Sequence, residues 1–122
     1  MYELTVSTHF DAAHSLTDYP GECARLHGHT FRVDVVVAGE ALNKIGLVYD
    51  FKDLKDKTND ILGRFDHRHL NEIPPFDRTT PTAENIANYL YHEIKLRGLP
   101  ANVSVKRVDV WESASARLSC SE

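Results

Sequence analysis

Cysteine is scarce in this chain of 122 residues, which contains only Cys23 and Cys120. Two thiols so far apart do not form the disulfide framework of a small secreted protein. Long apolar runs are also missing: the longest, residues 35–38, is far shorter than the roughly 20 residues that span a bilayer. The first residues lack the basic region and apolar block of a signal peptide. We therefore expect no membrane contact and a cytoplasmic location.

Basic charge is in short supply as well. Lys and Arg number 14 against 18 Asp and Glu, which gives a formal net charge of −4. Because non-specific binding to nucleic acid requires a basic face, we expect no nucleic-acid partner. The chain also has no GxGxxG or GxxxxGK[ST] phosphate loop, no GxSxG elbow and no HExxH helix. These absences argue against the common nucleotide-binding, serine-hydrolase and metalloprotease sites.

Periodic patterns predict four strands and two helices within one domain that covers residues 1–122. The predicted strands cover residues 2–14, 27–38, 102–112 and 117–120, and the predicted helices run from the N-cap Asp50 to about residue 65 and from Pro81 to Gly98. The first two strands carry polar residues on the face turned away from the helices. Four strands with two helices leave open sheet edges, so we expect pairing with further copies in a homo-oligomer.

Three histidines lie on the apolar faces of the first two predicted strands, at the end of the first strand and the start of the second. His27 and His29 are two residues apart and therefore share one strand face, and His14 ends the inward face of the preceding strand. Imidazole suits Zn²⁺, and three protein ligands with an open position are typical of a catalytic zinc site. Partly buried histidines that only form hydrogen bonds are the ordinary alternative. The convergence of all three favours a metal.

Four further residues are candidates for chemistry. Cys23 lies just before His27, where it could complete a structural zinc site or act as a free nucleophile or base. The spacing between Cys23 and His27 does not distinguish these two roles. Asp66 could orient His67 for proton transfer, although both could also be solvated turn residues. Glu112 ends an apolar strand face, where it either forms a surface pair or accepts two N–H groups from a ligand.

Taken together, these residues resemble the 6-pyruvoyltetrahydropterin synthase family over nearly the whole chain. The shared pattern consists of Phe10-x-Ala12-Ala13-His14, Cys23-x-x-x-His27-Gly28-His29, Asp66-His67, Pro81-Thr82-x-Glu84-Asn85 and Glu112. The spacing between the cysteine and the His-Gly-His sequence is more like the 6-carboxytetrahydropterin synthase branch of queuosine biosynthesis. The resemblance implies the α+β tunnelling fold (T-fold), a four-stranded antiparallel sheet with two helices on one face. Three subunits then close a twelve-stranded barrel, and two trimers stack as a homohexamer.

The resemblance also implies a zinc-dependent lyase. Its substrate is the small molecule 7,8-dihydroneopterin triphosphate, and its products are 6-carboxy-5,6,7,8-tetrahydropterin, acetaldehyde and triphosphate. The residues that the resemblance assigns are the Zn²⁺ ligands His14, His27 and His29, the general base Cys23, the proton-transfer pair Asp66 and His67, and the pterin anchor Glu112. Active sites at subunit boundaries would let Cys23 meet Asp66 and His67 of a neighbouring copy. Thr82 and Glu84 either help to line the pterin pocket or only begin the second helix.

Two alternatives stay open. A pyruvoyl-forming synthase would eliminate triphosphate and keep the side chain of the substrate. A non-catalytic, zinc-stabilised pterin-binding domain would instead use Cys23 as a fourth ligand. The sequence does not indicate which of four basic residues would bind the triphosphate: Arg25, Lys44, Lys106 or Arg117.

Overall fold

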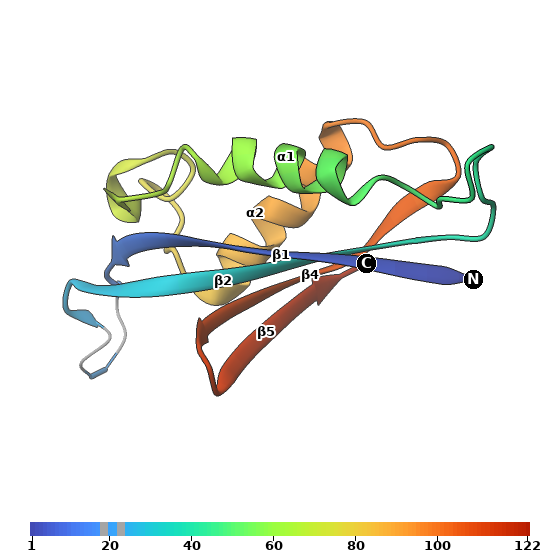
Figure 1. Ribbon diagram of the computed structural model, residues 1–122. Helices are drawn as coiled ribbons and strands as arrows, with labels where there is room; N and C mark the ends of the chain where they lie inside the picture. Colours follow the sequence, from blue (N-terminus) through green and yellow to red (C-terminus); the bar gives the residue numbers. More distant parts are fainter. Residues whose placement is uncertain (18–19, 22–23) are drawn as a thin grey trace.

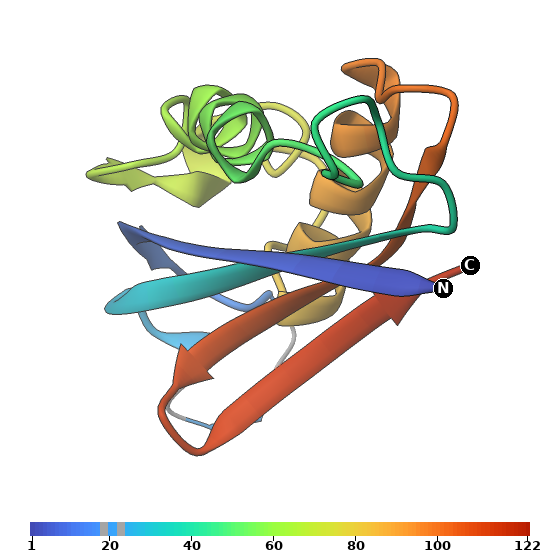
Figure 2. The ribbon, with the colours of Figure 1, turned by 45° about the vertical axis from the view of Figure 1, so that its right-hand side comes forward.

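The structure is a computed structural model, and it describes residues 1–17, 20–21 and 24–122. Cys23 therefore lies outside the described residues. The elements are, in chain order, β1 (Tyr2–His14), β2 (His27–Gly39), α1 (Phe51–Leu62), β3 (Arg68–His69), the 3₁₀ helix η2 (Leu70–Glu72), α2 (Ala83–Leu96), β4 (Val103–Ser113) and β5 (Ala116–Ser121). The two helices lie on one face of the sheet (Figures 1 and 2).

The strands form one sheet in the order β3-β1-β2-β4-β5. Neighbouring long strands pair antiparallel, whereas β3 pairs parallel with the end of β1. The predicted arrangement of four antiparallel strands with two helices on one face is confirmed. The fifth strand, β3, was not predicted, because two residues are too few to show an alternating pattern.

The register of β1 and β2 positions the three candidate histidines. Phe10 and Phe31 are cross-strand partners whose buried rings stack at a centroid distance of 5.0 Å. A slip of one residue would move this pair, and every other apolar side chain of the strand, to the opposite face. The observed register places His14 opposite His27 and Ala12 opposite His29. The packing of the core therefore determines where the imidazoles lie.

Helix α1 begins after the predicted N-cap Asp50, and α2 begins after Thr82, within the predicted start at Pro81-Thr82. The Asp50 side chain accepts a hydrogen bond from the backbone N–H of Lys52, and the Thr82 hydroxyl accepts one from that of Asn85. Gly98, with φ of 80°, follows α2 and supplies the left-handed conformation that commonly ends a helix. The buried helical side chains form one stripe on each helix: Leu54, Thr58, Ile61 and Leu62 on α1, and Ile86, Ala87, Leu90, Tyr91 and Ile94 on α2. Helix α1 ends three residues earlier than predicted, before the buried Phe65.

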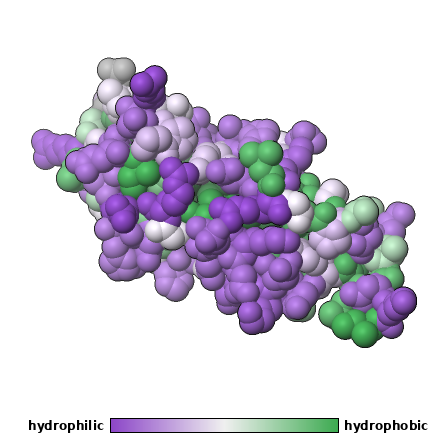
Figure 3. Space-filling view, turned by 90° about the horizontal axis from the view of Figure 1, so that it is seen from above, coloured by the Kyte–Doolittle hydropathy of each residue, from purple (hydrophilic) through white to green (hydrophobic). Residues whose placement is uncertain are grey.

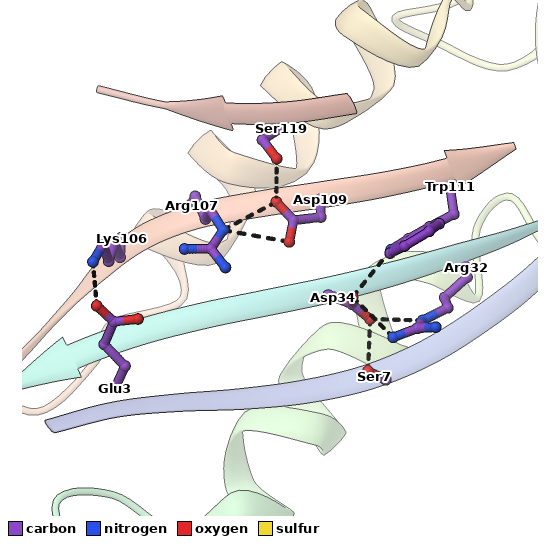
Figure 4. A network of polar contacts seen from close by, with 9 residues as sticks. All are labelled: Glu3, Ser7, Arg32, Asp34, Lys106, Arg107, Asp109, Trp111 and Ser119. Atoms are coloured by element: carbon purple, nitrogen blue, oxygen red, sulfur yellow. Dashed lines mark hydrogen bonds and ion pairs between the residues drawn. The ribbon is translucent and has the colours of Figure 1, made fainter. Parts of the chain in front are cut away.

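The sheet face turned away from the helices carries the predicted polar residues, but some of them are buried. Asp34 and Asp109 are cross-strand partners with almost no exposed surface (Figure 4). Two adjacent carboxylates would repel each other without compensating partners. Asp34 accepts hydrogen bonds from Ser7, Arg32 and Trp111. Asp109 accepts hydrogen bonds from Arg107 and Ser119.

These contacts make stability depend on pH through Asp34. Burial raises the pKa of its carboxyl group, but the hydrogen bonds from Ser7, Arg32 and Trp111 outweigh burial and hold that pKa below its ordinary value. Its charged form therefore stabilises the fold above the unfolded-state pKa of about 3.9, and this contribution is lost as the pH falls through the lower folded-state value.

We expect Asp34→Asn to lower the free energy of unfolding by about 1–3 kcal/mol at pH 7, because an amide cannot accept all of these bonds. Urea unfolding of both proteins across pH 3–7 measures the effect, and the difference should narrow toward pH 3. Asp56→Asn, at an exposed position of α1, is the control. A difference that does not depend on pH would contradict this account.

Seen from the helix side, the surface is mostly hydrophilic, with hydrophobic residues in separate patches (Figure 3). The exposed apolar side chains of the chain include Leu42, Ile45 and Leu47 in the loop before α1. Among the described residues, no helix is long and apolar enough to cross a membrane.

Candidate metal centre and active site

His14, His27 and His29 converge at the paired ends of β1 and β2. One ring nitrogen of each lies within 4.8 Å of those of the other two. The centroid of the His14 ring is 4.5 Å from that of His27 and 5.2 Å from that of His29. His14 is completely buried, and the other two are partly buried. The structure thus brings the three sequence-predicted imidazoles together on the helix side of the sheet.

Backbone carbonyls fix which nitrogen of two rings is free. The Nδ1 atom of His14 is 2.8 Å from the carbonyl oxygen of Pro81, and that of His27 is 2.7 Å from the carbonyl oxygen of Arg25. A carbonyl oxygen only accepts, so each Nδ1 carries the proton and each Nε2 keeps its lone pair. Orientation of an imidazole through its other nitrogen is a common feature of metal-binding histidines.

The Nε2 atom of His14 is the strongest indication of a ligand. It is buried and has no hydrogen-bond partner among the described residues. Leaving a buried polar atom without a partner costs about 1–3 kcal/mol, whereas a bound cation would satisfy the lone pair. The three imidazoles fit this role, and the group could bind a metal ion.

The environment of His14 also favours the neutral ring that a metal ligand requires. Burial is the largest influence and lowers the pKa of the imidazole. The neighbouring His27 and His29 lower it further, against the opposing effects of the Pro81 carbonyl and the Glu112 carboxylate. A neutral ring can coordinate a cation without first losing a proton.

Asp66 and His67 form a pair in the turn between α1 and β3. The Nδ1 atom of His67 is 3.0 Å from a carboxylate oxygen of Asp66. The pKa of Asp66 is lowered, mainly because its carboxylate accepts a hydrogen bond from the backbone N–H of Asp11 and also because of the contact with His67. Such a carboxylate stays ionised and can orient the imidazole, as proton transfer requires.

The Asp66–His67 pair packs against the edge of β1 at Asp11. Asp11 is the cross-strand partner of Thr30, whereas Ala12 is the partner of His29. Successive side chains of a strand point to opposite faces, so the side chain of Asp11 points away from the face that carries His29. A shallow groove of about 500 Å³ at this strand end is lined by residues that include Gly28, His29 and His67. Among the described residues, His67 thus shares this shallow groove with only one of the three imidazoles, that of His29.

A second pocket brings together the candidate substrate-binding residues. It has a volume of about 450 Å³, and its lining includes Leu16, Thr82, Glu84, Val110, Glu112 and Arg117. Apolar side chains and a terminal carboxylate suit a flat heterocycle with N–H donors. The charge of Glu112 raises the pKa of His14, which indicates that this pocket lies toward the imidazole cluster. The Thr82 hydroxyl also caps α2, so both roles considered for this residue fit its position.

Two residues at these sites carried no specific role in the sequence interpretation. Asp11 contacts the Asp66–His67 turn, and Leu16 lines the pocket of Glu112. Asp11 follows Phe10 inside the strand pattern, where alternation shows only that it faces away from the helices. Of the four candidates for the triphosphate, Arg117 lines the same pocket as Glu112. Lys106 is instead paired with Glu3.

Comparisons with known proteins agree with this geometry. Residues 3–122 match the sequence model of the family described as 6-pyruvoyl tetrahydropterin synthase. Dihydroneopterin monophosphate aldolase of Pyrococcus furiosus is 43% identical over 103 residues, which cover 84% of this chain and 82% of that protein. The 6-carboxy-5,6,7,8-tetrahydropterin synthase of Synechocystis sp. is 35% identical over 115 residues, which cover 90% of this chain and 88% of that protein.

The fold has a close match among solved structures. The structure of Caenorhabditis elegans 6-pyruvoyl tetrahydropterin synthase aligns with a TM-score of 0.88 and 26% sequence identity, over 99% of this chain and 95% of that chain. The predicted T-fold and the predicted family are confirmed together. On its sequence and its fold, the chain belongs to the 6-pyruvoyl tetrahydropterin synthase family.

Proposed function

We propose that this chain is a zinc-dependent 6-carboxytetrahydropterin synthase that acts in queuosine biosynthesis. It converts 7,8-dihydroneopterin triphosphate and water to 6-carboxy-5,6,7,8-tetrahydropterin, acetaldehyde and triphosphate. The observation that carries this proposal is the cluster of His14, His27 and His29, with a buried and unpartnered Nε2 atom beside the pocket of Glu112. Relatives named as this synthase, with identities of 33% and 35%, support the same reaction.

His14, His27 and His29 would hold the zinc ion. When bound, zinc supplies Lewis acidity that stabilises negative charge developing on the substrate side chain. Glu112 would accept two N–H groups of the pterin and fix the ring against the apolar wall of its pocket. Thr82 and Glu84 would line the rim of that pocket. The side chain of the substrate would then be directed toward the imidazole cluster.

Proton transfers would use residues on two sides of the substrate. Cys23 would accept a proton from the side chain as a general base. His67, oriented by Asp66 at 3.0 Å, would move protons on the opposite side. Because His67 shares only a shallow, open groove with His29 in one chain, we expect a second copy of the chain to complete the site. We expect the trimeric barrel and the homohexamer for this reason.

A second function is favoured by the relative with 43% identity, which is named dihydroneopterin monophosphate aldolase. Acting in that way, this chain would break a carbon–carbon bond of the substrate side chain by a retro-aldol step. The phosphate would leave on the aldehyde fragment and not as free triphosphate. The two reactions share the metal centre and the pterin pocket, but they differ in the small products.

The products therefore distinguish the candidates. The zinc-loaded protein is incubated separately with 7,8-dihydroneopterin triphosphate and with 7,8-dihydroneopterin monophosphate. We expect acetaldehyde and triphosphate in equal amounts from the first substrate and no turnover of the second. Triphosphate without acetaldehyde would indicate the pyruvoyl-forming reaction, and a phosphorylated aldehyde from the monophosphate would indicate the aldolase. Binding of either pterin without any product would indicate a non-catalytic domain.

A further inference from the structure

Asp11 makes three contacts with the turn that carries Asp66 and His67. Its backbone N–H donates to the Asp66 carboxylate at 2.9 Å, and its carbonyl oxygen accepts from the backbone N–H of His67 at 2.6 Å. A third contact comes from its side chain, whose Oδ2 atom is 3.9 Å from the Nε2 atom of His67. Any residue at this position could provide the two backbone contacts. The carboxylate is the part that depends on aspartate.

The carboxylate of Asp11 is itself held in place. Its Oδ1 atom accepts a hydrogen bond from the hydroxyl of Thr30, the cross-strand partner of Asp11 on β2. Its other oxygen is thereby left facing the imidazole of His67. The ring of His67 thus lies between two carboxylates, with Asp66 at Nδ1 and Asp11 at Nε2. At 3.9 Å the second contact is longer than a hydrogen bond, so it acts through charge or through one bridging water.

The backbone of His67 indicates that this ring position is imposed by its surroundings. Its φ angle of 59° lies in the left-handed region, which is uncommon for residues other than glycine. Such conformations persist where surrounding contacts hold them, often at functional sites. Here the backbone bond from His67 to Asp11 and the ring contact to Asp66 hold it.

We propose that Asp11 is a positioning residue for the reaction: its carboxylate holds the imidazole of His67 in the orientation used for proton transfer. The inference rests on the proposed function, in which His67 moves protons. Among the described residues, the other charged and titratable groups around His67 are Asp66, Arg68 and His69 on its own segment, His9 on β1, which affects the pKa of Asp66, and His29 across the groove. Asp11 does not line the pocket of Glu112, so its loss should affect turnover and not substrate binding.

Asp11→Asn tests this role, because it keeps the backbone contacts and nearly the same shape. We expect kcat for acetaldehyde release to fall about ten- to a hundredfold. KM, zinc content and melting temperature should stay close to the wild-type values. Asp11→Glu, which restores the charge, should recover most of the loss. Asp56→Asn removes a carboxylate from the exposed surface of α1 and serves as the matched control.

A second measurement needs no substrate. Carbon-13 relaxation of the His67 ring should show higher ring mobility in Asp11→Asn and no change in Asp56→Asn. If Asp11→Asn does not fold, Thr30→Val frees the Asp11 carboxylate and should show the same ring effect with a smaller fall in kcat.

Three results would overturn the proposal: wild-type kcat and ring mobility in Asp11→Asn, failure of Asp11→Glu to restore turnover, or a loss of zinc and melting temperature that accounts for the lower activity. Failure of the proposed function would appear separately, as a wild-type protein that releases no acetaldehyde. The ring measurement would still decide whether Asp11 positions His67.

Discussion

His14→Ala should remove both metal binding and turnover. The wild-type ring offers its Nε2 lone pair from a buried position, and its Nδ1–H is fixed by the carbonyl of Pro81. Alanine provides neither a ligand nor a replacement for that fixed geometry. We expect kcat to fall by roughly 10³-fold, the scale seen when a group that stabilises developing charge is removed.

Thermal unfolding with and without zinc measures the metal contribution directly. A ligand present at a thousand times its dissociation constant stabilises the folded state by about 4 kcal/mol. Zinc should therefore raise the melting temperature of the wild-type protein, and a chelator should reverse the increase. In His14→Ala this response should disappear. His92→Ala, at an exposed position of α2, should respond like the wild type. A His14→Ala protein that still binds one zinc ion with unchanged affinity would contradict the assignment.

The sequence was sufficient to predict the imidazole cluster because the pattern of β1 is regular up to its end. Apolar residues occupy the inward positions through Phe10 and Ala12, so His14 had to face inward as well. The two-residue spacing of His27 and His29 placed both on the matching face of β2. These inferences require only strand geometry and the register that the core imposes.

The buried carboxylates of the outer face could not be predicted in this way. The alternating pattern shows that the side chains of Asp34 and Asp109 face away from the helices. From the pattern alone, such positions are expected to be exposed to solvent. The side chains of Arg32, Arg107 and Trp111 bond to these carboxylates and cover them. This burial depends on long side chains from neighbouring positions and strands, so it cannot be predicted from a periodic pattern.

The position of His67 also depends on information that the sequence does not carry locally. Asp66-His67 was predicted as a pair from adjacency, but its position at the edge of β1 depends on the path of the chain after α1. That path includes a left-handed residue at His67 and the short strand β3 against the end of β1. Neither follows from propensity, since any residue other than glycine is uncommon in the left-handed region.

Cys23→Ala separates the enzymatic interpretation from the structural one. A thiol that acts as a general base is needed for turnover but not for the metal, because three imidazoles already provide a zinc site with an open position. We therefore expect Cys23→Ala to keep one zinc ion per chain and the wild-type melting temperature. Acetaldehyde release should fall by about 10²–10⁴-fold, the usual contribution of a positioned proton-transfer group.

Cys120→Ala is the matched control for that change. Cys120 lies on β5 as a partly buried free thiol, and no step of the proposed reaction uses it. Its replacement should leave acetaldehyde release unchanged, so a loss confined to Cys23→Ala would not come from the general removal of a thiol. If Cys23→Ala instead loses zinc and melts at a lower temperature, the sulfur is a fourth ligand. A closed site of four protein ligands has no open position, and the non-catalytic interpretation would then be favoured over the lyase.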